Sequence, residues 1–172
     1  DPAQAQQTVS LSVGNDALLR YSGSVNLPVS DEIAARFSFQ DARANGFRDN
    51  VFLDRNDTNR RRENLVRAKV RYRKASGMTW LGTFFRADAD NSFDAWATDN
   101  NEDLITYSDN PGKDRQLTSA VSLRGVLPLD KSGINLVSIT SYSDTELEHS
   151  YDGDWGNDSL WLADPYNFDP TI

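Results

Sequence analysis

Apolar residues occupy every second position along most of the chain. From residue 19 to 27 one parity reads Leu19, Tyr21, Gly23, Val25 and Leu27, and the other parity is polar. Because successive side chains of a strand point to opposite faces, this period of two indicates strands with one apolar and one polar face. Such runs predict seven strands, near residues 8–13, 18–28, 33–42, 64–73, 78–87, 116–125 and 134–146. No stretch shows a convincing helical period, so we predict an all-β chain.

The connections between these strands alternate in length. Segments 28–32, 73–77 and 128–133 are short and contain Pro, Gly, Ser or Asp, which favour turns. Long polar stretches lie near residues 43–63, 88–115 and 147–172, and the tight link at 14–16 is the exception. In an antiparallel up-and-down meander, alternate connections lie at the same end. Short connections at one end, long connections at the other and strands of about ten residues are typical of a large transmembrane β-barrel.

Composition removes several classes of protein. The chain has 172 residues, with 18 Lys and Arg against 26 Asp and Glu, and this excess of acids argues against a nucleic-acid partner. It contains no cysteine, which excludes a disulfide scaffold and a Cys-based zinc site. Mean hydropathy is −0.63, and no apolar run approaches the roughly 20 residues of a spanning helix. This composition does not exclude a transmembrane β-barrel, because its strands need only every second residue to be apolar.

A soluble β-sandwich is the alternative fold, since its strands also alternate between inside and outside. In that case the chain would be a secreted carbohydrate-binding module that binds sugars through Trp96, Trp155 or Trp161, with calcium as an optional ligand. Runs of ten or more alternating residues favour the barrel, because sandwich strands are commonly about 5–6 residues long.

Four segments resemble the early barrel of TonB-dependent outer-membrane receptors. Residues 23–38 (GSVNLPVSDEIAARFS) resemble the family's Gly-x-Val-Asn-x-Pro-(Leu/Val)-Ser-Asp turn and its following Ala-Ala/Leu-Arg strand. Residues 45–50, then 67–72, then 139–143 with 151–154 resemble later family segments in the same order. The resemblance covers roughly residues 8–169.

This resemblance implies a fold and a function. Family members have an N-terminal plug domain and a barrel of about twenty-two strands, so we expect the chain to be a segment of a larger barrel, without the plug. The implied function is active uptake of a scarce nutrient across the outer membrane of a Gram-negative bacterium. In this family the nutrient is usually a ferric siderophore and sometimes cobalamin, another metal complex or an oligosaccharide. The inner-membrane TonB complex would supply energy through the plug. The implied partners are outer-membrane lipid, the remaining barrel, the plug and the siderophore, with no cofactor and no enzymatic step.

Each face of the strands then receives an expected role. The apolar set would contact lipid: Leu19, Val25, Leu27, Ile33, Phe37, Phe39, Val66, Val70, Trp80, Phe84, Val121, Leu123 and Leu136. The opposite parity carries six cations that would face the lumen: Arg20, Arg36, Arg67, Lys69, Arg71 and Arg124. We expect carboxylates of the plug to pair with them, and the alternative is an electropositive path for an anionic ligand.

The long connections supply candidate ligand-binding residues. Residues 43–63 contain six Arg, whereas residues 88–115 contain eight acids and residues 146–169 seven more, with aromatic residues interleaved. Such loops are suited to recognising a ligand before uptake. The candidates are Arg60, Arg61, Arg62, Trp96, Tyr107, Trp155 and Trp161, and packing within the loops is the alternative role of the aromatic side chains.

Metal binding and catalysis have weaker signals. Asp152, Asp154 and Asp158 cluster in sequence as calcium ligands do, but the segment lacks the spaced Glu of an EF-hand. His149 is the single histidine and is interpreted as a surface residue. Glu146 and Glu148 are paired carboxylates, yet nothing in the sequence marks either as buried. We therefore predict no metal site and no enzymatic activity.

Overall fold

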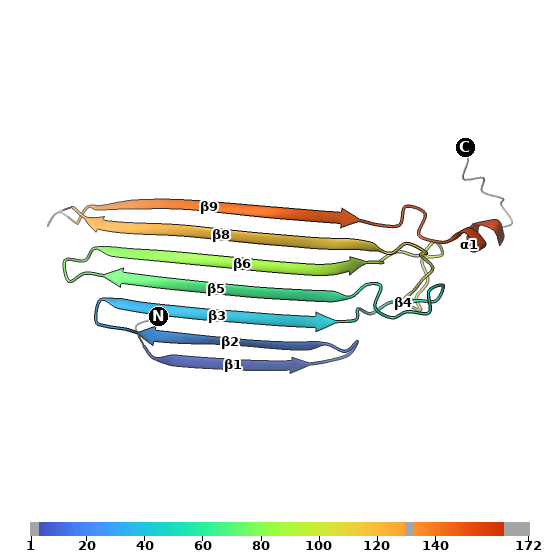
Figure 1. The fold of residues 1–172 in the computed structure, drawn as a ribbon, viewed down its shortest axis with the longest axis horizontal. Helices are drawn as coiled ribbons and strands as arrows, with labels where there is room; N and C mark the ends of the chain where they lie inside the picture. The colour runs from blue at the N-terminus through green and yellow to red at the C-terminus, as the bar shows by residue number, and fades with distance from the viewer. Residues whose placement is uncertain (1–3, 130–132, 164–172) are drawn as a thin grey trace.

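The protein is described by a computed structural model over residues 4–129 and 133–163, and it forms one layer of long antiparallel strands (Figure 1). The main sheet has the order β1-β2-β3-β5-β6-β8-β9, so each strand pairs with the next long strand in the chain. The predicted all-β meander of seven strands is confirmed. The sheet is open, and β1 and β9 form its two edges. The strands are β1 (Gln6–Val13), β2 (Leu19–Pro28), β3 (Ile33–Ala44), β5 (Arg61–Arg73), β6 (Thr79–Phe93), β8 (Gly112–Pro128) and β9 (Asn135–Ser150).

The later strands are longer than the alternation predicts. β6 continues to Phe93 and β9 to Ser150, where 87 and 146 were expected, and β5 and β8 begin three and four residues earlier than expected. In these extensions the positions that continue the apolar face are polar or charged, so the apolar signal disappears. Hydrogen bonding between backbones does not require apolar side chains, and the ladder therefore continues. The expected loops 43–63, 88–115 and 147–172 are shortened accordingly.

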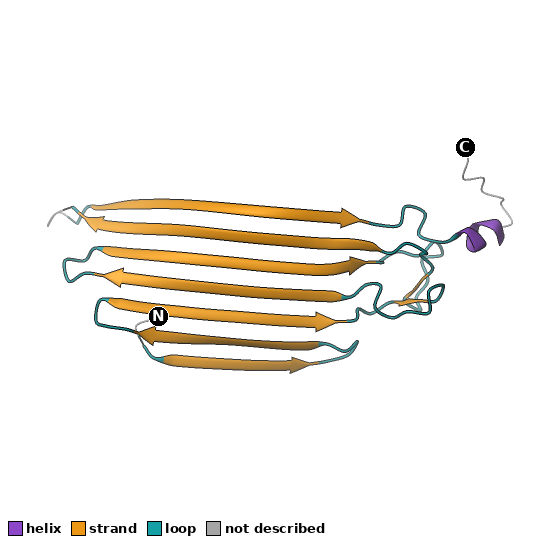
Figure 2. Ribbon diagram, in the orientation of Figure 1, coloured by secondary structure: helices purple, strands orange, loops and turns teal. Residues whose placement is uncertain are grey.

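Three small elements lie at the end with the long connections (Figure 2). β4 (Asp49–Asn50) and β7 (Ile105–Thr106) pair in parallel, and α1 (Asp158–Ala163) is a helix that the sequence analysis did not predict. Asn157 caps α1, because its side-chain oxygen accepts a hydrogen bond from the Leu160 N–H at 3.0 Å. Among the described residues no helix has the length and apolarity needed to cross a membrane.

The pairing register places all thirteen residues of the predicted apolar set on one face of the sheet. Val25 lies opposite Phe37, which lies opposite Ala68 and then Phe84 and Val121 on successive strands. We call this side the apolar face. The six predicted cations all lie on the other side, the polar face, where Arg36 is opposite Lys69. The predicted division of side chains between two faces is confirmed.

The apolar face is not covered. Within residues 4–129 and 133–163 the buried apolar side chains are Ala34, Ala42 and Ala97, whereas Val121 is 49% exposed. The described part of the chain has one long sheet and the two-residue pair β4–β7, with no second sheet against the apolar face. The β-sandwich alternative, which requires two stacked layers, is therefore contradicted.

Aromatic rings on the apolar face lie over glycines of the neighbouring strand. Phe39 is opposite Gly23, and a Cβ added to that glycine would lie 2.7 Å from the ring. Trp80 is opposite Gly125, where the corresponding distance is 2.6 Å. A ring that covers a glycine replaces the missing side chain and shields the strand backbone. Gly23 and Gly125 therefore allow large rings to lie flat against this face.

Charged residues replace apolar ones on the same face toward the long connections. On β6, Phe84 is followed at alternate positions by Arg86, Asp88 and Asp90. On β3, Phe39 is followed by Asp41 and Arg43. The apolar stretch is roughly 20–30 Å long at about 3.3 Å per residue. Beyond it the same face of the sheet continues with these charged residues, and we call this part the charged border.

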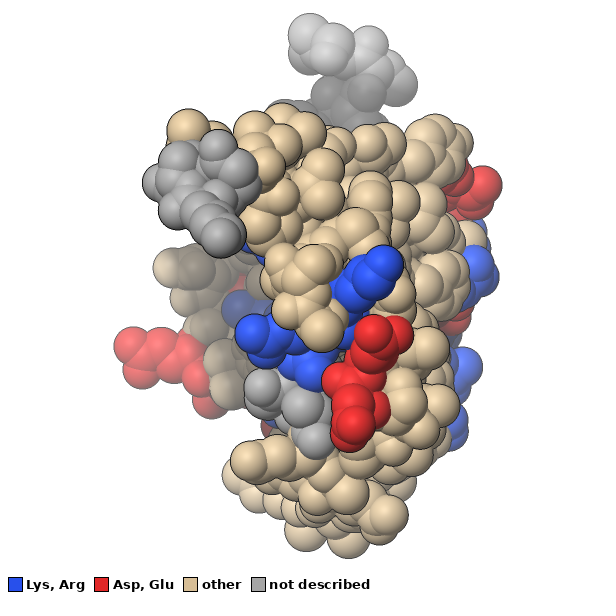
Figure 3. Space-filling view, turned by 90° about the vertical axis from the view of Figure 1, so that its left-hand side faces the viewer, with Lys and Arg blue, Asp and Glu red and all other residues tan. Residues whose placement is uncertain are grey.

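The opposite end of the sheet has short turns. The connections between β3 and β2, β5 and β6, and β8 and β9 lie there (Figure 1). Figure 3 looks onto this end and shows charged side chains gathered near its middle, with uncharged residues over most of the remaining surface. The predicted difference between an end with short connections and an end with long connections is confirmed. The tight link between β1 and β2 is the expected exception.

Candidate functional site

Three chain segments pack together at the end of the sheet with the long connections. They are residues 45–60, 94–111 and 151–163, which follow β3, β6 and β9 respectively. β4 and β7 join the first two, and the Val51 N–H also donates to the Thr106 carbonyl at 3.1 Å. The Asp109 N–H donates to the Gly156 carbonyl at 2.9 Å and joins the second segment to the third. We call this assembly the loop cap.

A network of buried polar side chains holds the loop cap together. Asn50 is 1% exposed, and its amide donates to the Asp94 carboxylate at 3.0 Å and to the Ser108 carbonyl at 2.8 Å. The Thr106 hydroxyl donates to the same Asp94 oxygen at 2.8 Å. The side-chain oxygen of Asn50 accepts from the Phe52 and Leu53 N–H groups. The side chains of Asn50, Asp94 and Thr106 thus have partners within this network, as stable burial of polar groups requires.

The third segment joins through two further hydrogen bonds. The Ser108 hydroxyl donates to the Asp152 carboxylate, and the Asn157 amide donates to the Tyr107 carbonyl at 2.8 Å. Hydrogen bonds therefore join segments that are far apart in sequence.

Aromatic side chains of the second and third segments form a surface cluster with Phe93 of β6 and His149 of β9. Trp96 lies at its centre, with ring centroids 5.3 Å from Phe93, 5.8 Å from Tyr151 and 5.4 Å from Trp155. His149 contacts Phe93 at 5.1 Å. Trp96 is 46% exposed, so a ligand can reach its ring. We call these five residues the aromatic cluster.

The aromatic cluster lies on the polar-face side of the sheet. Phe93 is opposite Gly112 and His149 is opposite Asp114, and both positions have the parity of the polar face. The cluster is therefore on the same side as the row of cations that runs along the strands below it. Flat rings above a cationic wall suit a ligand that combines planar rings or sugar faces with negative charge.

The predicted loop residues have different surroundings. Trp96 and Trp155 come together in the cluster. Tyr107 does not join them, because its hydroxyl donates to the Asp99 carboxylate at 2.7 Å. Trp161 is on α1, beside Gly156. Hydrogen bonds from Asn101 and Tyr107 lower the pKa of Asp99, and its carboxylate in turn raises the pKa of Tyr107.

The run Arg60–Arg61–Arg62 does not form one patch. Arg61 and Arg62 belong to β5 rather than to the expected loop, so their side chains point to opposite faces. Arg61 is opposite Ala44 on the polar face, and Arg62 is opposite Arg43 on the apolar face. Arg60 pairs with Asp90 at 3.6 Å and therefore lies on the apolar-face side. Because side chains alternate along the strand, Arg61 and Arg62 lie on opposite sides of the sheet although they are adjacent in the sequence.

Two cations of the polar face, Arg36 and Arg67, contact neutral groups of neighbouring strands. Arg36 donates to Asn26 and Ser24, both at 3.1 Å. The Arg67 guanidinium lies 5.2 Å from the centre of the Phe85 ring. These contacts orient the guanidinium groups without cancelling their charge, so the face is electropositive in the strand region.

Asp152, Asp154 and Asp158 do not assemble into a metal site. Asp152 accepts hydrogen bonds from Ser108 and from the Asp154 N–H, and Asp154 accepts from the Gly156 N–H. Asp158 begins α1. In the described ranges, no three His, Asp or Glu side chains are close enough together to hold a metal ion. The acids shape the turn before the helix.

His149 is exposed, as the sequence analysis expected, but its contact with Phe93 was not predicted. Its lone occurrence suggested a surface residue, and Phe93 and Tyr151 were only two of many interleaved aromatic residues. Extending the alternation of β6 and β9 by a few residues places Phe93 and His149 on the polar face at the cap. Their meeting with Trp96 depends on the fold of the loops, for which the sequence has no periodic signal.

Comparison with protein-family models, with curated proteins and with solved structures found no match to this chain. The functional argument therefore depends on the geometry and on the sequence pattern.

The buried network makes a prediction for Asn50. Replacing Asn50 by Ala removes a donor from the Ser108 carbonyl and the acceptor of the Phe52 and Leu53 N–H groups, and it leaves the Asp94 carboxylate with the Thr106 hydroxyl. Each buried group left unsatisfied costs about 1–3 kcal/mol. We expect faster amide hydrogen exchange across residues 45–60 and 94–111, with unchanged exchange in the middle of β6. Asn56→Ala, at an exposed position of the same segment, is the matched control. Unchanged exchange in N50A would show that the network does not hold the cap.

Proposed function

We propose that this chain forms part of the wall and outer rim of a TonB-dependent outer-membrane receptor that takes up a ferric siderophore. In this proposal the apolar face contacts lipid, the polar face lines the interior, and the loop cap lies outside the cell. Uptake involves binding at the rim, rearrangement of a plug and release inside, without covalent chemistry. The inner-membrane TonB complex supplies the energy through the plug.

The observation that carries the proposal is the uncovered apolar face. Thirteen predicted apolar positions share this face, and several of their side chains are 40–50% exposed, among them Phe37, Val121 and Leu123. In water such a face would cost roughly 25 cal/mol for each Å² of apolar surface. A lipid environment removes this cost. The roughly 20–30 Å length of the apolar stretch is similar to the apolar band of about 25 Å on outer-membrane barrels.

The order of the connections supports the same proposal. Turns at one end are short, whereas residues 45–60 and 94–111 at the other end build a folded cap. Outer-membrane barrels have short periplasmic turns and long external loops. The two edges β1 and β9 would pair with further strands, because unpaired backbone groups are not tolerated in hydrocarbon. The resemblance of residues 23–38 to the early barrel of the family adds to this support.

The cluster and the cations define a path for the ligand. The exposed ring of Trp96 lies at the outer end of the polar face, and Arg36, Lys69 and Arg67 lie along the strands below it. A ferric chelate with aromatic and anionic groups would stack first on the rings and then move along the positive wall. Acidic groups of a plug would balance the same cations when the path is closed.

Adjacent residues of β8 allow a direct test of lipid contact. Val121 lies on the apolar face and Ser122 on the polar face. An Arg at the lipid-facing midplane of a barrel costs about 2–4 kcal/mol, whereas lumen positions tolerate it. We expect Val121→Arg to lower the free energy of unfolding in lipid vesicles by that amount, and Ser122→Arg to change it by less than about 1 kcal/mol. Denaturant titration of the full-length protein measures both.

Equal effects of the two substitutions would contradict the assignment of faces. A wild-type protein that is monomeric and folds cooperatively in plain buffer would reject the membrane proposal.

Surface labelling tests which end is external. The sequence contains no cysteine, so each introduced thiol is unique in this chain. Asn101→Cys and Asp154→Cys, both in the loop cap, should react with a membrane-impermeant thiol reagent on intact cells. Ser76→Cys, in the turn between β5 and β6, should react only after the cells are opened. The reverse pattern would invert the proposed orientation.

The aromatic cluster makes a prediction for uptake. Trp96→Ala removes the central ring, and loss of a stacking contact of this kind costs about 0.5–1.5 kcal/mol. We expect the half-saturating concentration of radiolabelled ferric chelate to rise about threefold to tenfold, with an unchanged maximal rate. Catecholate and hydroxamate chelates are the probes. Phe52→Ala, which removes an exposed ring of the loop cap outside the cluster, is the control and should leave uptake unchanged. An equal loss of uptake in both variants would show that the aromatic cluster does not bind the ligand.

A further inference from the structure

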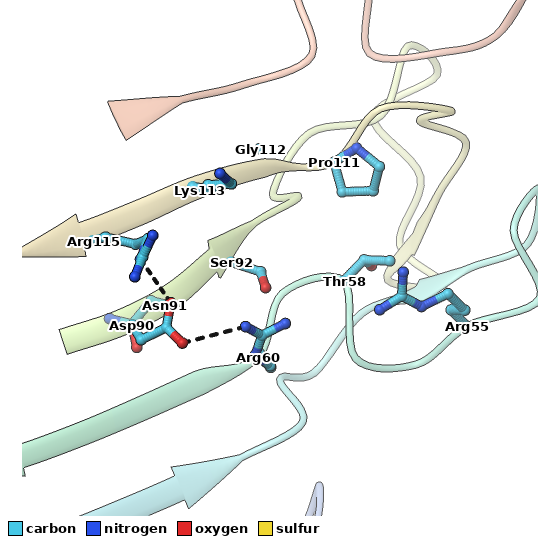
Figure 4. A pocket seen from close by; sticks show the side chains of 10 residues that line it. All are labelled: Arg55, Thr58, Arg60, Asp90, Asn91, Ser92, Pro111, Gly112, Lys113 and Arg115. Carbon is cyan, nitrogen blue, oxygen red and sulfur yellow. Dashed lines mark ion pairs between the residues drawn. The ribbon is translucent and has the colours of Figure 1, made fainter. Parts of the chain in front are cut away.

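A cationic pocket lies between the loop cap and the charged border of the sheet (Figure 4). It has a volume of about 380 Å³, and four of its lining residues are cations: Arg55, Arg60, Lys113 and Arg115. Asp90 is the one carboxylate among its lining residues. Figure 4 shows Arg60 and Arg115 on either side of Asp90, with their guanidinium groups bordering the same space. The pocket is thus formed by three separate parts of the chain.

Carboxylates only partly neutralise these cations. Asp90 accepts from Arg115 at 2.8 Å and lies 3.6 Å from Arg60. Glu148 contacts Lys113 at 2.9 Å and Arg115 at 3.1 Å, and Asp57 contacts Arg55 at 2.8 Å. With four cations and three carboxylates the group keeps a positive charge. Glu148 and Asp57 are at least two-fifths exposed, so their pairs are weak and a stronger anion can displace them.

Two buried donors in this pocket have no protein partner. Thr58 is 2% exposed and lines the pocket, and its hydroxyl has no hydrogen-bond partner among the described residues. In the same described part, the buried Nε of Arg60 also lacks one. Unpaired buried polar groups are uncommon, because each loses its hydration without compensation. An anion with several oxygens in the pocket would satisfy both donors.

The register shows on which side the pocket opens. Asp90, Ser92, Lys113 and Arg115 all have the parity of the apolar face. Arg115 is two residues beyond Leu117, roughly 7 Å along β8, and Asp90 is roughly 20 Å beyond Phe84 along β6 at about 3.3 Å per residue. The pocket is therefore on the lipid-facing side, beyond the apolar stretch. The aromatic cluster is on the opposite side of the same sheet.

We propose that this pocket binds a phosphate group on the headgroup of a membrane glycolipid, an inference that depends on the proposed contact of the apolar face with lipid. A phosphate has the charge and the oxygen atoms to accept from two guanidinium groups and from the Thr58 hydroxyl. Lys113 adds a point charge at the rim. Arg115, roughly 7 Å beyond the apolar stretch of β8, lies at the depth of the headgroup region, which is directly outside the hydrocarbon core.

The position also argues against the transported ligand as occupant. A nutrient that enters a barrel follows the polar face, whereas the sheet itself separates the pocket from that face. Ser92 lines the pocket and its neighbour Phe93 belongs to the aromatic cluster, so adjacent residues of β6 serve opposite sides. A ligand on the lipid-facing side must come from the membrane or from the external solution, and the experiment separates these two sources.

Binding to three probes tests the inference with the full-length protein in detergent micelles. The probes are lipid A with its phosphates, the same lipid after enzymatic dephosphorylation, and inorganic phosphate. We expect Arg60→Gln and Arg115→Gln each to weaken binding of the phosphorylated lipid about tenfold or more, since each loses a charge-assisted contact. Thr58→Val, which keeps the shape and removes the hydroxyl, should weaken it about threefold to tenfold.

Arg86→Gln is the matched control, because Arg86 is on the same face of β6 but outside the pocket. It should leave affinity within about twofold, which is the effect expected of an exposed charge. Insertion of each variant into vesicles, measured on the same samples, verifies folding. Equal affinity for the phosphorylated and dephosphorylated lipids would overturn the inference, as would unchanged binding in R60Q and R115Q.

The remaining outcomes are also decisive. Inorganic phosphate that binds as tightly as the phosphorylated lipid would identify a free-anion site and overturn the lipid source. Failure of the wild-type protein to insert into any vesicle would reject the proposed function itself. Normal insertion combined with no preference for the phosphorylated lipid would reject this inference alone.

Discussion

The separation of apolar and polar side chains by the pleat of one sheet is the constraint on which the rest of the structure depends. Neighbouring backbones pair over seven strands, and the register aligns all thirteen predicted apolar positions on one face. In the described part, the buried apolar side chains are three alanines, so the hydrogen-bond ladder holds the strands together without a conventional core. The apolar face of this sheet lacks the burial of apolar surface that is ordinarily the main source of stability.

The loop cap is held by a different interaction. Its interior is polar, and Asn50, Thr106 and Ser108 are almost completely buried. The Asn50 side chain makes two hydrogen bonds within its own segment and two to the segment 94–111, which fixes the positions of these two loops relative to each other. Polar networks of this kind specify one arrangement because any alternative leaves a buried group unpaired. The cap can therefore present Trp96 and Trp155 as a fixed surface, although it has almost no apolar interior.

The long sheet also separates two kinds of recognition. On the polar side, rings of the aromatic cluster lie above a row of cations. On the apolar side, the charged border carries a pocket with unpaired buried donors. Ser92 and Phe93 are adjacent in sequence and belong to these two sites respectively. Strand alternation thus lets one element contribute to two sites on opposite sides of the sheet.

Alternation determined the number of long strands and the face of every predicted apolar and cationic residue, because a period of two is a local property of the backbone. The lengths of the connections indicated the meander and the end with the long loops. Alternation did not determine where β6 and β9 end, since polar and charged residues occupy the apolar-face positions there while backbone pairing continues. Arg61 and Arg62 were expected in a loop with Arg60, whereas they belong to β5 and lie on opposite faces. The meeting of His149 with Phe93 and Trp96, and the pocket around Thr58, required the tertiary structure. Both arise where loops distant in sequence are brought together by non-local hydrogen bonds, and no local pattern encodes such contacts.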